Sequence, residues 1–237
     1  MVIAIAKIWA RLVRFGFRLL YNEFAFTYDL VSQFVSMGAW GCWGKSALDH
    51  LNAAYGDRVL EIAHGTGHVH IELHHAGYQA YGIDLSPNMG QIARNRLQAV
   101  NLPSRLTRGM AQALPFPSES FAAVVSTFPA EFIIAPETLR EVARVLRPGG
   151  RFVIVPNAVF TARGAGVKGL EFLYRITGQR ADVDQSATDA TNQAMAHLFS
   201  PFGFDVSIVQ APCPRSLVTV IIAERQRSSE IGTGNPP

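Results

Sequence analysis

Glycine and carboxylate side chains stand at spacings in this chain that suit the binding of an adenosine-containing molecule. Gly65 and Gly67 end the sequence Val-Leu-Glu-Ile-Ala-His-Gly-Thr-Gly over residues 59–67, and glycine in a turn lets the backbone approach a ligand closely. Asp84 ends the next apolar run along the chain, where a carboxylate can accept two hydrogen bonds from a ribose diol. The turn and the aspartate together predict a nucleoside site.

The same turn distinguishes between two kinds of cofactor. A dinucleotide site needs a third glycine, in the pattern Gly-x-Gly-x-x-Gly, to admit a pyrophosphate, and the turn has none at that spacing. Glu61 would repel a diphosphate, whereas it suits a cofactor that ends in an ammonium group. We therefore expect S-adenosyl-L-methionine rather than NAD(P). His64, within the turn, would either orient the methionine carboxylate of that cofactor or only satisfy the turn.

The elements that must position these residues follow from the alternation of apolar runs with helical patterns. That alternation predicts right-handed βαβ units in a parallel sheet with helices on both faces. The predicted strands are residues 58–63, 79–84, 105–109, 122–127 and 151–155, and the predicted helices between them are 67–75, 87–100 and 137–146. Two further runs, 204–210 and 216–224, are too close in sequence for a parallel crossover, so they should pair antiparallel.

The expected fold class is therefore α/β, with a Rossmann-like, seven-stranded, mostly parallel sheet, an antiparallel closing strand and an N-terminal helical cap. Residues 1–54 would form the cap or lid, with helices over 3–20, 28–37 and 44–54. Residues 55–226 would form the α/β domain. Residues 227–237, which are polar and rich in Ser, Gly and Pro, would form a flexible tail.

Four segments, taken in order, resemble the class I methyltransferases of the ubiquinone/menaquinone-biosynthesis type. They are residues 61–67, 82–86, 109–121 and 139–150. By that resemblance Gly65 and Gly67 would approach the methionine moiety, Asp84 would hold the ribose, and Leu85 would pack on one adenine face. The backbone of Met110 and Ala111 would line the edge of the adenine. Tyr28, in a segment like the family's cap, would face the methyl-transfer pocket.

Two departures from the family pattern lie inside this site. Ala63 stands where the family usually has glycine, a mild change if the turn keeps a negative φ there, as alanine prefers. Met110 stands where an acid usually contacts the adenine amine, so that contact would pass to Gln112 or the backbone, or be lost. The candidate cofactor-binding residues are Glu61, Ala63, His64, Gly65, Gly67, Asp84, Leu85, Met110 and Ala111.

Methyl transfer from a sulfonium is an in-line displacement that depends mainly on alignment and desolvation. A base is needed only if the acceptor keeps a proton until the transition state. Phe128, just after the fourth strand, would pack against the sulfonium or the acceptor, or would be ordinary core. Glu131 would be a base, or only a solvated loop acid. With Tyr28, these are the candidate catalytic residues, and an apolar or planar small molecule is the expected acceptor.

The sequence does not predict a metal site. Five of the seven histidines fall between residues 64 and 75, and His70 and His74 share a helix face, as zinc ligands can. No Cys or acid cluster completes such a set, so the segment is interpreted as a partly exposed helix beside the cofactor turn.

Charge and cysteine usage set expectations about partners and compartment. Lys7, Arg11, Arg14 and Arg18 carry four positive charges, and without them the net charge of +3 becomes −1, which argues against nucleic-acid binding. This basic stripe would belong either to a lid or to a helix over residues 3–20 in peripheral contact with a membrane. Two distant cysteines, taken as free thiols, and no secretory signal indicate a cytoplasmic chain.

Two other functions remain at this point. The first is a catalytically silent S-adenosylmethionine-binding or regulatory subunit, which the departures at Ala63 and Met110 motivate. The second is an NAD(P)-dependent oxidoreductase, which the glycine pattern disfavours. The sequence does not predict the oligomeric state.

Overall fold

The computed structural model describes residues 33, 36, 38–161 and 188–227, and the structural statements below concern that part of the chain. Seven strands form one sheet in the order β3-β2-β1-β4-β5-β7-β6. Neighbouring strands are parallel except at β7, which is antiparallel to both β5 and β6. The strands are β1 (Arg58–Ile62), β2 (Gln79–Asp84), β3 (Leu106–Arg108), β4 (Phe121–Thr127), β5 (Leu146–Phe160), β6 (Phe204–Cys213) and β7 (Ser216–Arg225). The predicted fold class is confirmed.

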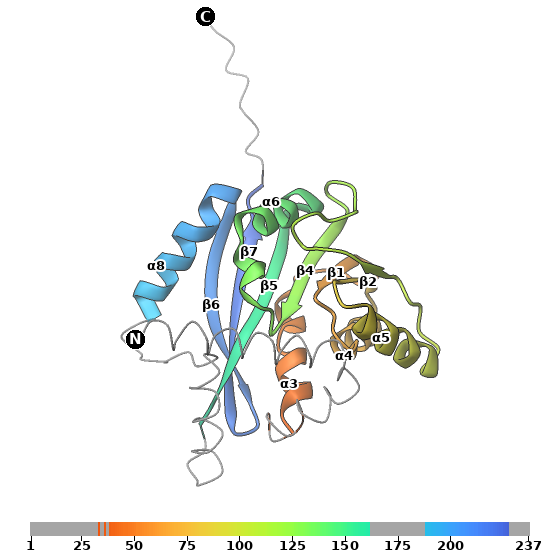
Figure 1. Ribbon diagram of the computed structural model, residues 1–237. Coiled ribbons are helices and arrows are strands. Elements are labelled where there is room, and N and C mark those ends of the chain that lie inside the picture. Colours follow the sequence, from red (N-terminus) through yellow and green to blue (C-terminus); the bar gives the residue numbers. More distant parts are fainter. Residues whose placement is uncertain (1–32, 34–35, 37, 162–187, 228–237) are drawn as a thin grey trace, which may run out of the picture.

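Helices cover both faces of this sheet (Figure 1). On one face, Leu139 and Val142 pack with Phe199 in a buried apolar cluster, and on the other face Trp43 packs with Val69. The helices are α3 (Trp40–Lys45), α4 (His68–His75), α5 (Pro87–Ala99), α6 (Pro136–Val145) and α8 (Thr188–Phe199), with 3-10 turns η2 (Leu48–His50), η3 (Glu131–Ile134) and η5 (Ser200–Phe202).

The strand order reverses between β1 and β4, and this reversal marks the place where open α/β sheets bind ligands. Ile62 lies beside Ile83 of β2 at the carboxyl end of β1. Ser126, near the end of β4, donates a hydrogen bond from Oγ to the carbonyl oxygen of Ile62 at 2.8 Å. The two central strands are therefore joined at the sheet edge where the glycine turn begins.

Two elements differ from the sequence prediction. The helix expected over residues 44–54 is instead α3, which starts at Trp40, followed by the short turn η2. The fifth strand begins at Leu146 rather than Arg151 and reaches Phe160. Leu146 already pairs with Phe121 of β4, and a register shift follows in the ladder. The Pro-Gly-Gly sequence at residues 148–150 thus lies within β5, beyond the end of α6 at Val145, and is accommodated as an irregularity of the strand.

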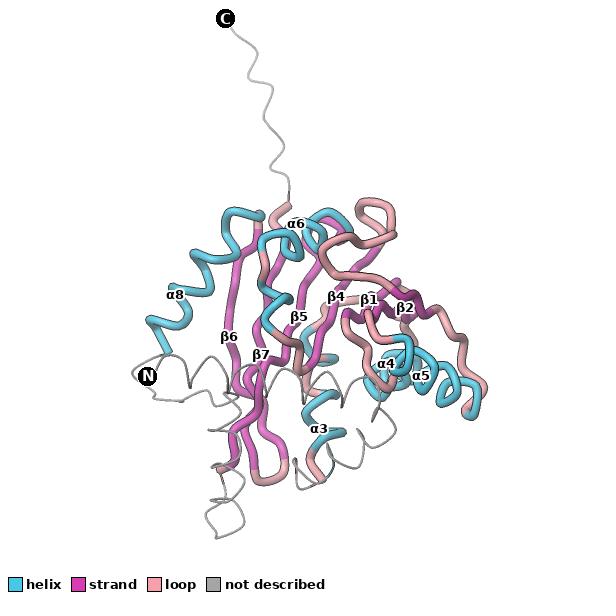
Figure 2. Tube along the Cα trace, viewed as in Figure 1, coloured by secondary structure: helices cyan, strands magenta, loops and turns pink. Residues whose placement is uncertain are grey.

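The expectation of two free thiols is wrong. Cys42 of α3 and Cys213 at the end of β6 form a disulfide across a sequence separation of 171 residues. Figure 2 shows the turn between β6 and β7 at the same end of the molecule as α3. The pairing removes the argument that free thiols indicate a reducing compartment.

Several predictions concern residues outside the described part of the chain. They are the basic helix over 3–20, most of the helix over 28–37 including Tyr28, and the tail after Arg227. Within the described ranges, every helix is too short or too polar to pass through a bilayer.

Candidate functional site

The turn after β1 contains three residues with positive φ. They are Ala63 at 57°, Gly65 at 52° and Gly67 at 84°. A Cβ added to Gly65 would meet no atom within 4 Å, so the space beside this glycine is open. A Cβ on Gly67 would lie 3.0 Å from the Cβ of Ala93 and 3.3 Å from its Cα, so glycine here lets α5 pack closely. The turn therefore presents bare backbone to open space at Gly65.

Ala63 does not have the negative φ that we expected from the sequence. Its φ of 57° lies in the left-handed region, where a Cβ costs roughly 1–2 kcal/mol. Its N–H donates to the carbonyl oxygen of Ile83 at 2.8 Å, which continues the contact between β1 and β2 by one residue. Alanine in place of glycine is therefore strained at position 63, and the change is not the mild one that we expected.

Asp84 points toward the glycine turn. Its Oδ2 accepts a hydrogen bond from the N–H of Gly65 at 2.9 Å, and its Oδ1 accepts one from the N–H of Ser86 at 2.8 Å. Each carboxylate oxygen can accept a further hydrogen bond, and the side chain is only half-buried. The aspartate and the open space beside Gly65 are thus held together at one sheet edge, and they fit a nucleoside diol.

Glu61 lies beneath the turn and contacts a histidine that the sequence did not single out as a site residue. Its carboxyl is 2% exposed, and Oε2 lies 3.0 Å from Nδ1 of His70, which is fully buried. Burial raises the pKa of Glu61 to about 8 and lowers the pKa of His70 to about 4. Both shifts favour the neutral forms, and therefore favour a hydrogen bond between neutral groups over an ion pair.

His64 is part of the turn itself, and its side chain packs against Gly82 of β2. Its ring is 4% exposed, and Nδ1–H donates to the carbonyl oxygen of Gly65 at 2.9 Å. A Cβ on Gly82 would lie 3.0 Å from the ring of His64 and 3.2 Å from the ring of His70. Glycine in β2 therefore makes room for both imidazoles under the turn.

Two exposed apolar side chains flank the end of β2. Leu85 is 61% exposed and Met110 is 51% exposed, whereas Ala111 is buried. The segments that carry them are joined, because the N–H of Gly109 donates to the carbonyl oxygen of Asp84 and Arg108 Nε donates to that of Leu85. Exposed leucine and methionine next to Asp84 offer an apolar surface that suits a purine.

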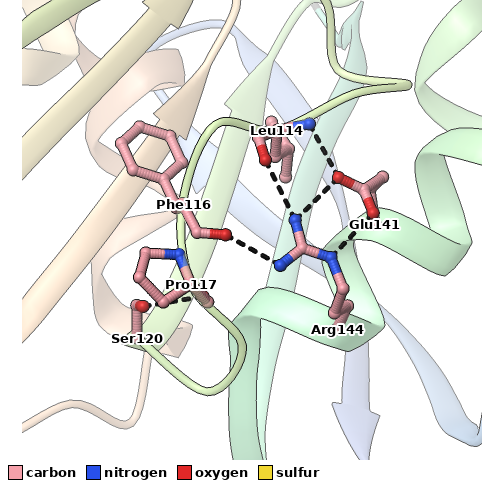
Figure 3. Close-up of polar contacts among 6 residues, drawn as sticks. All are labelled: Leu114, Phe116, Pro117, Ser120, Glu141 and Arg144. Carbon is pink, nitrogen blue, oxygen red and sulfur yellow. Dashed lines mark hydrogen bonds and ion pairs between the residues drawn. The ribbon is translucent and has the colours of Figure 1, made fainter.

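The segment from Gly109 to Ser120 crosses from β3 to β4 without a helix of its own. Arg144 of α6 donates to the carbonyl oxygens of Leu114 and Phe116 at 2.9 and 2.7 Å (Figure 3). Glu141 binds both the Arg144 guanidinium and, at 2.7 Å, the N–H of Leu114. These hydrogen bonds from Arg144 lower the pKa of the Glu141 carboxyl. The contacts fasten the crossover that begins at Met110.

An aromatic cluster occupies the neighbouring part of the sheet edge, after β4. Phe128 has a φ of 49° and donates its N–H to the carbonyl oxygen of Val155 at 2.7 Å. Its ring stacks on Trp40, with centroids 4.7 Å apart and planes at 27°, and lies 5.6 Å from Trp43. Trp43 in turn lies 5.6 Å from Phe160. We call Trp40, Trp43, Phe128 and Phe160 the aromatic cluster.

Two long-range contacts fix α3, which carries Trp40 and Trp43, to the turn between β6 and β7. Trp43 donates its indole N–H to Oγ of Ser216 at 2.8 Å, and the disulfide joins Cys42 to Cys213. The helix is thus fixed to both ends of the β6–β7 turn. Trp40, on the same helix, is only partly buried, so its stack with Phe128 reaches the surface. Trp40 was not among the residues predicted from the sequence, although its spacing of three residues from Trp43 places both on one helix face.

The remaining predicted residues have simpler positions. Glu131 begins η3 and is exposed, and Tyr28 lies outside the described residues. Helix α4 is partly exposed, as predicted, with His75 at the surface and His70 fully buried. Among the residues that the structure describes, no three His, Cys, Asp or Glu side chains gather closely enough to hold a metal ion.

Comparison with known proteins gives the class of this site. A family model described as a methyltransferase domain matches residues 60–154. The demethylmenaquinone methyltransferase of Thermus thermophilus is 35% identical over 164 residues, which cover 68% of this chain and 72% of that protein. The ubiquinone/menaquinone biosynthesis C-methyltransferase of Geobacter sulfurreducens is 31% identical over 142 residues, which cover 57% of this chain and 56% of that protein.

Solved structures share the fold at low sequence identity. The geranyl diphosphate C-methyltransferase of Streptomyces coelicolor superposes with a TM-score of 0.57 at 13% identity, over 78% of each chain. The phosphoethanolamine N-methyltransferase 2 of Haemonchus contortus superposes with a TM-score of 0.59 at 15% identity, over 84% of this chain and 56% of that one.

Fold, turn and relatives thus define a class I methyltransferase. The chain belongs to the family of S-adenosyl-L-methionine-dependent methyltransferases of the ubiquinone/menaquinone-biosynthesis type. Enzymes of this family are methyltransferases that use S-adenosyl-L-methionine and act on small molecules.

Proposed function

We propose that the protein transfers the methyl group of S-adenosyl-L-methionine to a flat, largely apolar acceptor with a hydroxylated aromatic ring, such as a quinol. The observation that carries the proposal is the position of the aromatic cluster. Phe128 directly follows β4, which runs parallel beside β1, so its partly exposed stack with Trp40 lies at the same edge of the sheet as the glycine turn. The names of relatives as demethylmenaquinone methyltransferases support the same acceptor class.

The cofactor would be held by residues on β1, β2 and the turns that follow them. Asp84 would accept hydrogen bonds from the ribose diol with its remaining lone pairs, and Glu61 would face the ammonium group. Leu85 would cover one adenine face. The backbone of the turn would line the methionine moiety, and that of Met110 and Ala111 the adenine edge. Ala63, His64, Gly65 and Gly67 make up that turn.

The chain's own contribution to the reaction would be alignment and exclusion of water. The cofactor supplies an activated methyl group, so the protein has only to place the acceptor carbon, oxygen or nitrogen in line with it. A flat ring stacked against Trp40 and Phe128 would be held by dispersion and quadrupole contacts. If a ring carbon is methylated, loss of the acceptor's hydroxyl proton increases the nucleophilicity of that carbon, and exposed Glu131 is our candidate to take this proton.

Residues 1–54 would act as a cap over this acceptor site, with Tyr28 facing the methyl group. The described end of that segment supports the cap, since α3 supplies two rings of the aromatic cluster. The same supply of rings by an apolar helix disfavours the silent-subunit alternative, because a regulatory module needs no acceptor site.

The test is an acceptor assay on Trp40→Ala, with Tyr55→Ala as the matched control. Tyr55 is 89% exposed and precedes β1, so it lies at the opposite edge of the sheet. Formation of S-adenosylhomocysteine would be followed with a quinol that lacks a ring methyl, and in parallel with phosphoethanolamine. We expect the wild type to methylate the quinol but not phosphoethanolamine. In Trp40→Ala, kcat/KM for the quinol should be roughly tenfold lower at unchanged cofactor affinity. Tyr55→Ala should behave like the wild type. Turnover of the amine alone, or equal kcat/KM in both variants, would contradict the proposal.

A further inference from the structure

Glu61 and His70 form a buried polar pair beneath the glycine turn. A contact between the cofactor and Glu61 would not by itself require His70. His70 stands in the first turn of α4, directly after the left-handed N-cap Gly67. Its ring is completely buried. Within the described residues its Nε2 meets no hydrogen-bond partner, so Nδ1 with Glu61 provides its polar contact. An orphaned nitrogen in a buried ring is costly, and its retention directly under the site calls for a function.

The geometry points to a positioning residue for the cofactor's amino-acid end: we propose that His70 holds the Glu61 carboxyl beneath the turn and takes up its proton when an ammonium group binds. This inference rests on the proposed function, since it concerns the same cofactor. In the transfer, the O–H bond of Glu61 breaks and an N–H bond forms at Nδ1 of His70, 3.0 Å away. The carboxylate then faces the ammonium as an anion.

The proton is kept within the pair because both partners are shielded from water. Glu61 is 2% exposed and His70 is fully buried. Without ligand, burial keeps Glu61 neutral, with its pKa raised to about 8, and keeps His70 neutral, with its pKa lowered to about 4. A cation above Glu61 favours its ionised form, and the resulting carboxylate favours a charged His70. The two effects together move the preferred site of the proton from Glu61 to His70.

Other charged and titratable groups surround the pair from every neighbouring element. His64 in the turn and His68 on α4 lower the pKa of Glu61, and Asp84 at the end of β2 raises it. Arg105, before β3, lowers the pKa of His70. His74, one turn along α4, has its ring centroid 5.3 Å from that of His70, and burial lowers its pKa to about 4. His74 therefore stays neutral and adds no competing charge near pH 7.

Two ligands separate this inference from general effects on the fold. S-adenosylhomocysteine carries the ammonium group, and 5′-methylthioadenosine has the same nucleoside without the amino-acid end. Calorimetric affinities for both would be measured at about pH 6.5 and about pH 7.5, below the pKa of Glu61. In the wild-type protein we expect both affinities to be nearly independent of pH, because the proton displaced from Glu61 stays on His70.

The decisive variant is His70→Asn, whose amide can keep a hydrogen bond to Glu61 but cannot take up a proton. We expect its affinity for S-adenosylhomocysteine to fall about tenfold per pH unit on acidification, since the proton must now leave to solvent. Its affinity for 5′-methylthioadenosine should stay flat. Glu61→Gln keeps the shape of the carboxyl but cannot become an anion. Its affinity for S-adenosylhomocysteine relative to 5′-methylthioadenosine should therefore be lower than that of the wild type at every pH.

The outcomes distinguish the inference from the proposed function. A wild-type protein that binds S-adenosylhomocysteine with a tenfold pH dependence of its own would overturn the role of His70 and leave the methyltransferase function intact. Equal pH profiles of the wild type and His70→Asn would do the same. Failure of the wild type to bind either ligand would instead contradict the proposed function. If His70→Asn does not fold, the wild-type profile and Glu61→Gln still decide the question.

Discussion

The two halves of the candidate site are built in different ways. On the cofactor side, contacts such as Gly65 with Asp84 and Glu61 with His70 join residues that are 19 and 9 positions apart. On the acceptor side, Trp43 binds Ser216 across 173 positions, and Cys42 binds Cys213 across 171. The cofactor side is a local polar arrangement, and the acceptor side depends on parts of the chain that meet only after folding.

This difference indicates how the two halves should respond to change. A local set of hydrogen bonds between adjacent strand ends depends little on the rest of the chain. A cluster held by one helix, one disulfide and one hairpin turn is easily loosened. Changes on the acceptor side should therefore alter stability and acceptor use while leaving cofactor binding almost intact.

The largest expected effect comes from breaking the disulfide. Cys42→Ser should lower the free energy of unfolding by about 2–4 kcal/mol, because a bond that closes so long a loop restricts the unfolded chain. Denaturant unfolding of the wild type and the variant, each with and without a dithiol reductant, measures this. Thiol titration of the untreated protein supplies the control. Reductant should destabilise only the wild type. If the wild type and Cys42→Ser unfolded at the same denaturant concentration without reductant, the disulfide would not stabilise the fold.

The next effect is a pH dependence that arises on the cofactor side. Glu61 has its folded-state pKa raised from 4.5 to about 8, so its contribution to stability is lost as pH rises toward 8. His70 and His74 have their pKa values lowered from 6.5 to about 4, so their contributions are complete above pH 6.5 and are lost on acidification. Between about pH 6.5 and pH 8 only the effect of Glu61 remains.

We therefore expect the ligand-free protein to lose about 1–2 kcal/mol of stability over that interval. Unfolding in urea at a series of pH values measures the slope. Glu61→Gln, which has no proton to lose, should give a flat profile there, whereas Glu72→Gln on the solvent side of α4 should keep the wild-type slope. A wild-type protein that becomes more stable between pH 6.5 and pH 8 would contradict the buried neutral carboxyl.

The smallest effect concerns Ala63. Ala63→Gly should raise the free energy of unfolding by about 0.5–1 kcal/mol, since the relief of a left-handed alanine exceeds the added entropy of the unfolded chain. The melting temperature should rise by about 1–4 °C. Ala76→Gly, at an exposed position with a φ of −74°, should lower stability instead. If both variants changed stability in the same direction, the strain at Ala63 would be refuted.

The sequence predicted the cofactor side far better than the acceptor side, because contacts on the cofactor side join residues that are close in sequence. β2 has the predicted bounds and β1 ends within one residue of them, because an apolar run between turn signals is a local pattern. The approach of Asp84 to Gly65 follows from parallel strands that end at one edge. The disulfide and the stack of Trp40 on Phe128 depend on tertiary contacts that no local pattern contains.

Some features of the cofactor side were also beyond the sequence. The burial of His70 depends on Gly82 of the neighbouring strand, whose missing side chain leaves space for the ring. The expectation of a partly exposed helix holds for α4, but the sequence did not indicate that His70 would be one of its buried residues. The φ of Ala63 likewise follows from its hydrogen bond to Ile83 rather than from the preference of alanine.

The most direct test of a self-contained cofactor site is a calorimetric titration of S-adenosylhomocysteine into the wild type, Asp84→Asn and Asp49→Asn. Asp49 is an exposed acid in η2, so its variant is the matched control. We predict one binding site in the wild type and in Asp49→Asn, unaffected by reduction of the disulfide, and at least about tenfold weaker binding in Asp84→Asn. Equal affinity in all three proteins, or no binding to the wild type, would contradict the assignment of Asp84 and the glycine turn as the cofactor site.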